Sequence, residues 1–237
     1  MNNLLKYLLL FTIPFLSVAC SSDNGVSESG IPPVMTLFYQ NADALAKTYD
    51  PSNKVSQPLR NEIFDLYKQG NWSSLEALFK NNSLNGDWPP ANGGYNIIDN
   101  VPFAAGQKYD RYSGAVGNYS GTGVPTLGGS FTSPIVNGYR YTFSQRALNM
   151  PEKAYDFYYE IDILNNLLSF QGQLADVIPW FGQVGGGAQM MWKIPIDPMT
   201  GYQKTWNKLV QEGYIKVTIV KSPSGKYNSQ AGTVIQK

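Results

Sequence analysis

The chain has 237 residues, with 18 Lys and Arg against 17 Asp and Glu, which gives a formal net charge of +1. This balance does not supply the basic surface of a nucleic-acid-binding protein, so no nucleic-acid partner is expected. The sequence has no His and one Cys, which excludes Ser-His-Asp and Cys-His nucleophile systems, His-ligated zinc, Cys-rich metal clusters and intrachain disulfides. The sequence has no acidic cluster of the kind that binds calcium, and we predict no metal site.

Residues 1–19 have the pattern of a secretory signal peptide. Lys6 precedes an apolar run over residues 7–16, and small residues then lead to Cys20. The apolar run is too short for a comfortable bilayer crossing. We therefore expect residues 1–19 to be removed on export.

The junction at Cys20 resembles a bacterial lipobox, in which the Cys becomes the lipid-modified first residue. The stretch reads Leu16-Ser17-Val18-Ala19-Cys20, with Ser17 where Leu is usual. An ordinary signal with a chance Cys and an uncleaved anchor helix are the alternatives. Residues 20–33 favour the lipoprotein, because their Ser- and Gly-rich composition suits a flexible tether. The predicted location is lipid-anchored in the cell envelope, at the outer membrane or cell surface, or secreted.

Residues 34–83 are predicted to form a small helical segment. Pro58 suits a first helical position, and Gly70 ends the run in which Leu59, Ile63, Leu66 and Tyr67 recur at helical spacing. Ser73-Ser74-Leu75-Glu76 matches a capping box that opens a second short helix through Phe79.

Residues 84–237 are predicted to form one mixed domain of strands and helices. From Trp88 onward, short apolar runs alternate with Gly, Pro, Asn and Ser, as in strands and turns. Thr205 to Glu212 is typical of a helix, and Ile215 to Ile219 alternates like a half-buried strand. The predicted fold class is α+β: a bent antiparallel sheet pair with peripheral helices, preceded by the small helical segment.

Five stretches of this domain stand out. Taken singly, each has an ordinary explanation as a surface cation, a turn or a core aromatic. Their order and content together are more specific. They are Trp88-Pro89-Pro90-Ala91-Asn92-Gly93-Gly94, Asp110-Arg111-Tyr112-Ser113-Gly114, Gly128-Gly129-Ser130-Phe131-Thr132-Ser133-Pro134, Phe143-Ser144-Gln145-Arg146-Ala147-Leu148 and Pro179-Trp180-Phe181-Gly182-Gln183-Val184-Gly185-Gly186-Gly187-Ala188-Gln189.

This set of motifs resembles the tuberculosis necrotizing toxin domain family of NAD(P)+ glycohydrolases. The resemblance covers about residues 84–220. Ser113 stands where the family has Gly, and residues 115–127 look like an insertion. The resemblance implies that NAD+ or NADP+ is the substrate, that no separate cofactor is needed, and that a toxin of this kind has an immunity protein as partner.

Two arginines are the predicted phosphate ligands. A planar guanidinium grips phosphate oxygens bidentately, and Arg111 and Arg146 lie in the matching motifs. The resemblance implies that these positions serve the substrate, with Arg111 in a catalytic role and Tyr112 beside it in binding. The alternative for either arginine is a structural ion pair with a local carboxylate such as Asp110.

The scissile bond joins nicotinamide to ribose, and its cleavage needs no histidine. Nicotinamide leaves as a neutral molecule through an oxocarbenium-like transition state, so positioning matters more than a strong nucleophile. The resemblance implies an essential Gln, for which Gln189 is the first choice and Gln183 the second. Gly186 and Gly187 are assigned to close backbone approach to the ligand. A loop-bonding role is the alternative for Gln183.

Phe131 and Glu160 complete the candidates. Phe131 occupies a place where family members carry a substrate-facing aromatic, with core packing as the alternative. Glu160 lies in an apolar run, where it would stabilise an oxocarbenium ion, bind ribose or, in keeping with the alternation, lie on the solvated face of a strand. Trp180 and Phe181 are assigned to support of their loop.

The predicted function is NAD+ glycohydrolysis, giving nicotinamide and ADP-ribose, by a lipid-anchored toxin. The alternatives are an ADP-ribosyltransferase or cyclase, and a catalytically inactive NAD-binding lipoprotein.

Overall fold

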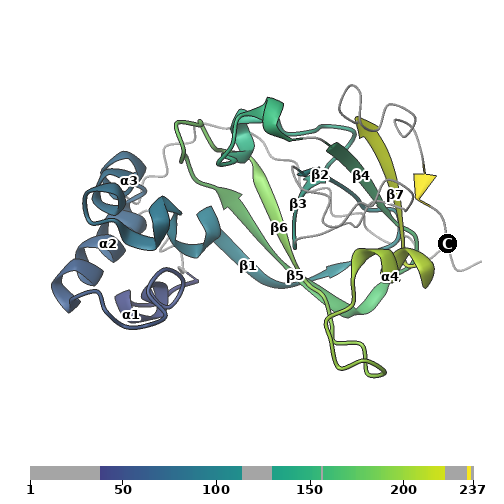
Figure 1. Cartoon of the computed structure of the whole chain (residues 1–237), viewed down its shortest axis with the longest axis horizontal. Coiled ribbons are helices and arrows are strands. Elements are labelled where there is room, and N and C mark those ends of the chain that lie inside the picture. Colours follow the sequence, from purple (N-terminus) through teal and green to yellow (C-terminus); the bar gives the residue numbers. More distant parts are fainter. Residues whose placement is uncertain (1–37, 114–129, 156, 222–233, 236–237) are drawn as a thin grey trace, which may run out of the picture. The chain divides into compact units, whose positions relative to one another are not determined.

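The computed structural model describes residues 38–113, 130–155, 157–221 and 234–235 (Figure 1). The predicted signal peptide, Cys20, the tether and the insertion at residues 115–127 lie outside the described residues. Within the ranges that are described, no helix is long and apolar enough to cross a membrane.

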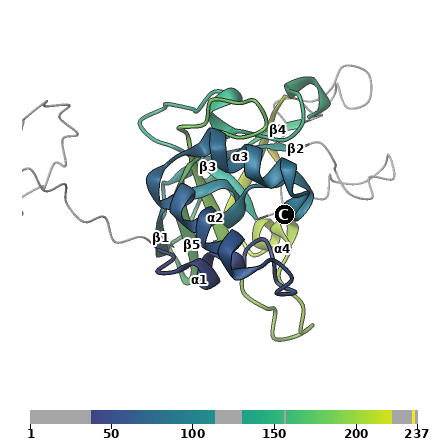
Figure 2. The same ribbon diagram turned by 90° about the vertical axis from the view of Figure 1, so that its left-hand side faces the viewer.

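Three helices precede the sheet: α1 (Ala42–Ala46), α2 (Gln57–Gln69) and α3 (Trp72–Asn81). The prediction for α2 is confirmed, with Pro58 in its first turn and Gly70 left-handed at φ 68° as its cap. Figure 2 looks onto these three helices, with the strands behind them.

The predicted capping box at Ser73 is wrong. Asn71 caps α3, and its side chain accepts a hydrogen bond from the Ser74 N–H at 3.4 Å. The same Asn71 donates its N–H to the Leu66 carbonyl at 3.0 Å, which completes the turn that ends α2. Because one residue both closes α2 and opens α3, the second helix begins before Ser73.

The described strands form one antiparallel sheet in the order β1-β5-β6-β3-β2-β4-β7-β8. The predicted α+β class is confirmed. Their bounds are β1 (Gly94–Phe103), β2 (Lys108–Ser113), β3 (Phe131–Ile135), β4 (Phe157–Ile163), β5 (Leu167–Val177), β6 (Ala188–Lys193), β7 (Ile215–Lys221) and β8 (Val234–Ile235).

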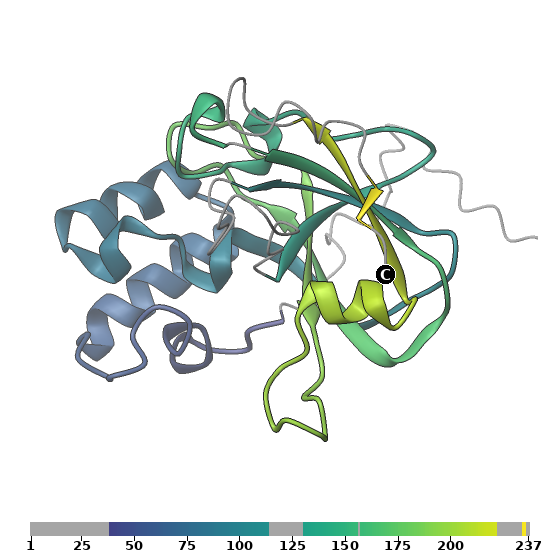
Figure 3. The ribbon, with the colours of Figure 1, turned by 45° about the vertical axis from the view of Figure 1, so that its right-hand side comes forward.

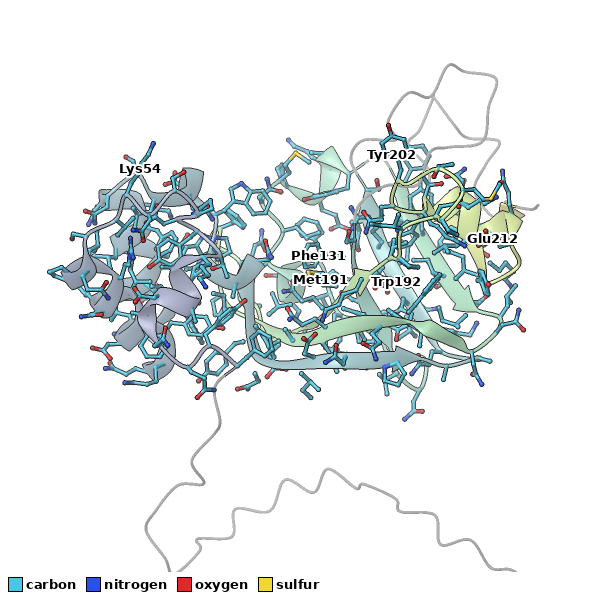
Figure 4. All side chains as sticks on the ribbon, turned by 90° about the horizontal axis from the view of Figure 1, so that it is seen from below. Lys54, Phe131, Met191, Trp192, Tyr202 and Glu212 are labelled. Atoms are coloured by element: carbon cyan, nitrogen blue, oxygen red, sulfur yellow. The ribbon has the colours of Figure 1, made fainter. Side chains whose placement is uncertain are left out.

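Strand β3 joins the two halves of the sheet. Its first residues, Phe131 and Thr132, pair with β6, whereas residues 133–135 pair with β2. In Figure 4, Phe131 lies beside its partner Met191. The two predicted sheets are therefore two halves of one sheet that meet at β3.

The larger core lies between the sheet and α4 (Trp206–Gln211), which lies beside β7 in Figure 3. The predicted α4 helix is confirmed, with Thr205 as its cap. The predicted alternation in β7 is also confirmed, since its side chains at positions 215, 217 and 219 are buried.

A second core joins the helices to the loops around the sheet end. Its buried residues include Leu75 and Phe79 of α3 and Trp180 of the β5–β6 loop. Short 3-10 turns, η1 (Leu84–Asp87) and η2 (Pro90–Gly93), lead from the helices into β1. Two more, η3 (Ser144–Arg146) and η4 (Glu152–Ala154), lie between β3 and β4.

Candidate functional site

A cavity of about 320 Å³ lies where β2, β3 and β6 meet three loops. The loops are residues 88–93, 146–155 and 177–181. The structure places five predicted site residues in the lining: Arg111, Tyr112, Phe131, Arg146 and Gln189. Residues more than 70 positions apart in the chain therefore share one cavity. Gln183, Gly186 and Gly187 are not among the lining residues.

The triple glycine approaches the chain itself. A Cβ on Gly185 would lie 2.5 Å from Pro179 N, and one on Gly187 would lie 2.6 Å from Gln145 O. The N–H groups of Gly185 and Gly187 donate to the carbonyls of Ser144 and Gln145 at 3.2 and 2.9 Å. The close approach to a ligand that we predicted is therefore not observed: Gly187 approaches the η3 turn, which carries Arg146, and a Cβ on Gly186 would have no atom within 4 Å.

Gln183 belongs to a tight turn beside the cavity. Its N–H donates to the Trp180 carbonyl at 2.9 Å, and the two residues form an isolated β-bridge. Trp180 is 1% exposed and donates its indole N–H to the Asp87 carbonyl at 2.8 Å. The structural role predicted for Trp180 agrees with this burial, although its side chain also reaches the cavity wall.

Arg146 is neutralised by a buried carboxylate. Its Nη1 is ion-paired with Asp110, which is 0% exposed, and its Nε donates to the Tyr141 carbonyl at 3.0 Å. The Tyr158 hydroxyl donates to the other oxygen of Asp110. The guanidinium also lies over the Tyr112 and Tyr158 rings, 5.2 and 6.0 Å from their centroids.

Among the described residues, Arg111 has no such carboxylate. Its Nη1 donates to the Phe131 carbonyl, and its buried Nε has no hydrogen-bond acceptor among the described residues. No Asp or Glu in the described ranges forms an ion pair with it. Burial lowers the pKa of Arg111 below its ordinary value, with a smaller opposing effect of Tyr155 and Tyr159.

The strand geometry explains why adjacent residues do not pair. Successive side chains of β2 point to opposite faces, so Asp110 turns away from Arg111 and toward Arg146. The cavity therefore contains one guanidinium compensated by a carboxylate and one that forms no ion pair with the described residues.

Gln189 spans the cavity wall between β6 and the residue 88–93 loop. Its Nε2 donates to the Asn92 carbonyl at 3.1 Å. Gly94 gives it room, because a Cβ there would lie 3.1 Å from the same nitrogen. The amide is thus held by one end, and its oxygen has no donor among the described residues.

Residues with left-handed backbone gather at the cavity. Asn92, Ala147 and Phe181 have φ of 51°, 45° and 54°, and all three line it. For a bulky residue such as Phe181 this conformation is strained, and strain of this kind concentrates at functional sites. The Phe181 ring packs edge-on against Trp88, with centroids 5.3 Å apart.

Sequence reasoning missed the wall formed by residues 149–155. The Tyr155 hydroxyl donates to Asn149 Oδ1 at 3.2 Å, and its ring packs 6.1 Å from that of Tyr112. Asn149, Met150 and Tyr155 line the cavity. The segment carries no motif; an unassigned tyrosine beside the Arg-Ala-Leu stretch was the available signal.

Glu160 lies outside the cavity lining. It accepts a hydrogen bond from Arg140 Nε at 2.8 Å, and its side chain is 24% exposed. Of the predicted positions, the one on the partly solvated face of β4 is the one observed. Within the described residues, no cluster of three or more Asp, Glu, Cys or His could hold a metal ion.

Comparisons with known proteins add little to this geometry. No family model matches the sequence, and no curated protein matches it. Among solved structures, the chain is similar to that of tuberculosis necrotizing toxin (TNT) complexed with its immunity factor, with 19% identity and a TM-score of 0.37. The match covers 54% of this chain and 60% of that chain, less than two thirds of its length. A similarity at this level defines neither the fold nor the function.

Proposed function

We propose that the protein is an NAD+ glycohydrolase, which hydrolyses the bond between nicotinamide and ribose and releases ADP-ribose. The observation that carries this proposal is Arg111, a guanidinium in the cavity without a carboxylate partner among the described residues. A charge removed from water without a partner is costly, so it is kept where a ligand supplies the missing anion. The motif resemblance in the sequence supplies the substrate class.

The Arg111 guanidinium, whose Nε has no acceptor among the described residues, suits a phosphate oxygen. Guanidinium groups bind phosphate through two parallel hydrogen bonds, and the low dielectric of a half-buried site strengthens them. Arg146 contributes less charge, because Asp110 neutralises it. We assign the first phosphate contact to Arg111 and the shaping of the adjacent Tyr112 wall to Arg146.

The aromatic residues suit the rings of the substrate. Arg111 contacts the Phe131 carbonyl, and Trp88 and Phe181, which pack against each other, also line the cavity. Flat rings stack well on such side chains, and the cavity volume of about 320 Å³ is at the small end for a binding site. The nicotinamide-ribose half would fill the cavity, and the adenosine half would extend from its mouth.

Hydrolysis of the nicotinamide–ribose bond does not require a strong general base. The C–N bond breaks, its electron pair neutralises the pyridinium ring, and nicotinamide departs. Water then forms a C–O bond to the ribose carbon and loses its proton to solvent. The Gln189 amide oxygen can accept a hydrogen bond from that water or from a ribose hydroxyl, because the Asn92 contact fixes the amide.

Hydrolysis suits the lining better than ADP-ribosyl transfer. Glu160, the carboxylate that a transferase would use, is paired with Arg140 outside the lining. Asp110 is occupied by Arg146 and Tyr158. We further propose, from the sequence alone, a lipid-anchored toxin attached through Cys20 and restrained by an immunity protein.

The test is an assay of the purified protein with etheno-NAD+, followed by mass spectrometry of the products. Free ADP-ribose and nicotinamide support the proposal, whereas a cyclic product or a modified protein supports the transferase class. Binding of NAD+ without nicotinamide release identifies an inactive binding protein. A parallel assay with NADP+ measures the preference between the two substrates.

The sharpest variant is Gln189→Ala. Turnover should fall by about 100-fold or more, since removal of one positioned polar group has this effect in other enzymes. ADP-ribose binding should change much less. Gln183→Ala is the matched control, because this glutamine lies in the neighbouring turn and outside the lining. Wild-type turnover in Gln189→Ala would remove Gln189 from the mechanism.

A further inference from the structure

Phe181 lies in a tight turn whose backbone conformation is unfavourable for a bulky residue. Trp180 and Gln183 flank two central residues, Phe181 at φ 54° and Gly182 at φ 71°. A two-residue turn with both φ values positive prefers Asn, Asp or Gly at these positions. Gly182 fits this rule and Phe181 does not, so the surrounding structure must hold Phe181 in place.

Helix α3 supplies that support. Glu76 Oε1 accepts the Phe181 backbone N–H at 3.2 Å, with the glutamate side chain 19% exposed. Three residues further along the same helix, Phe79 packs edge-on against Trp180, with ring centroids 5.6 Å apart. One face of α3 thus contacts both residues at the start of the turn.

Two other residues that precede the sheet, Tyr67 of α2 and Thr48 of the turn after α1, hold the residue 88–93 loop and the start of β1. The Tyr67 hydroxyl donates to the Gly94 carbonyl at 2.6 Å, and the Ala91 N–H donates to Thr48 Oγ1 at 2.8 Å. These contacts flank Asn92, the residue whose carbonyl fixes Gln189. The helical segment therefore reaches the cavity wall from two directions.

We propose that Glu76 is a positioning residue of the cavity. Its carboxylate holds the Phe181 N–H, which keeps the strained turn formed and the Phe181 ring against Trp88 in the wall. The helices before residue 84 then belong to the binding site, although they precede the part of the chain that carries the motifs. The identity of the ligand rests on the proposed function, whereas the support of the turn does not.

Hydrogen exchange of the full protein tests the support directly. Glu76→Ala should speed exchange of the Phe181 amide by about tenfold, because a hydrogen bond to a charged acceptor is lost. Glu76→Gln keeps an oxygen acceptor and should restore most of the protection. Lys80→Ala is the matched control, since it removes the Lys80–Glu76 ion pair and leaves the carboxylate.

Ligand affinity is the second measurement, with ADP-ribose as the probe and NAD+ as the substrate. Glu76→Ala should weaken ADP-ribose binding and raise the KM for NAD+ about tenfold, with a smaller change in kcat. Glu76→Gln should rescue both, and Lys80→Ala should change neither.

The two measurements separate the two proposals. Faster Phe181 exchange in a protein that binds neither nucleotide leaves the role of Glu76 standing and removes the glycohydrolase. Unchanged exchange and unchanged affinity in Glu76→Ala overturn the role of Glu76. The role of Glu76 is also overturned if Lys80→Ala speeds Phe181 exchange or weakens ADP-ribose binding as much as Glu76→Ala does, because a loss of α3 stability would then explain both variants.

Discussion

The two arginines of the cavity lie in opposite electrostatic settings. On one side, Arg146 is buried against Asp110, donates to a backbone carbonyl and lies over two tyrosine rings. On the other, Arg111 donates to the Phe131 carbonyl and retains a buried Nε without an acceptor among the described residues. One arginine therefore has a carboxylate partner, and the other has none among the described residues.

This difference is the basis of our proposal that Arg146 serves the fold and Arg111 a ligand. A buried ion pair adds little net stability, but either partner alone is strongly destabilising. Arg146 and Asp110 therefore depend on each other. Arg111 forms no ion pair with a carboxylate of the described residues, and its Nε lacks an acceptor there, which is why we propose that an anion from outside binds it.

Asp110→Asn should produce the largest effect on stability. The substitution leaves Arg146 buried without its counter-charge, which should lower the free energy of unfolding by about 3–5 kcal/mol. Urea unfolding followed by tryptophan fluorescence measures the loss. Glu160→Gln breaks the more exposed pair with Arg140 and should cost about 1 kcal/mol or less. Equal losses in the two variants would show that Asp110 and Arg146 do not depend on each other more than an exposed ion pair does.

Arg111→Met should change ligand affinity rather than stability. The variant removes a charge that burial destabilises and loses one hydrogen bond, so the free energy of unfolding should stay within about 1 kcal/mol of the wild type. Binding of ADP-ribose should weaken by about 2 kcal/mol, or roughly 30-fold, through loss of the phosphate contact. Isothermal titration calorimetry measures the affinity.

Arg140→Met is the control for that variant, because Arg140 is paired with Glu160 outside the cavity lining. It should leave ADP-ribose affinity unchanged. Wild-type affinity in Arg111→Met would mean that its charge serves no phosphate.

Local signals made much of the fold predictable. Pro58 and Gly70 fix the ends of α2 because each has a strong backbone preference. Alternation in β7 follows from its burial on one face. The start of α3 escaped prediction because Asn71 serves two helices at once, and a capping rule for one helix considers only one.

The partners in the cavity needed the three-dimensional structure. Asp110 adjoins Arg111 in the sequence but pairs with Arg146, 36 positions away, because strand geometry separates neighbours. The motifs identified five of the residues that line the cavity, but not which of the two arginines is paired with Asp110. Gly187 was likewise recognisable as a site of close approach, whereas its partner, Gln145, lies far along the chain.

Tyr158→Phe should give the smallest effect and probes the Arg146 side by pH. Burial and the adjacent Asp110 carboxylate raise the pKa of Tyr158 above its ordinary value of 10, because a phenolate there would be poorly solvated and repelled. The unfolded chain loses this proton near pH 10 while the folded chain keeps it, so stability declines as pH rises above 10.

Removal of the hydroxyl should therefore have two consequences. At pH 7 the free energy of unfolding should fall by about 1 kcal/mol, since Asp110 loses one donor. Between pH 10 and about 11.5, the further decline should be shallower than in the wild type, because one titrating group is gone. Urea unfolding across this range measures both. If the free energy of unfolding declined equally with pH in the two proteins, the pKa of Tyr158 would not be raised by folding. The contact between Tyr158 and Asp110 would then be weaker than proposed.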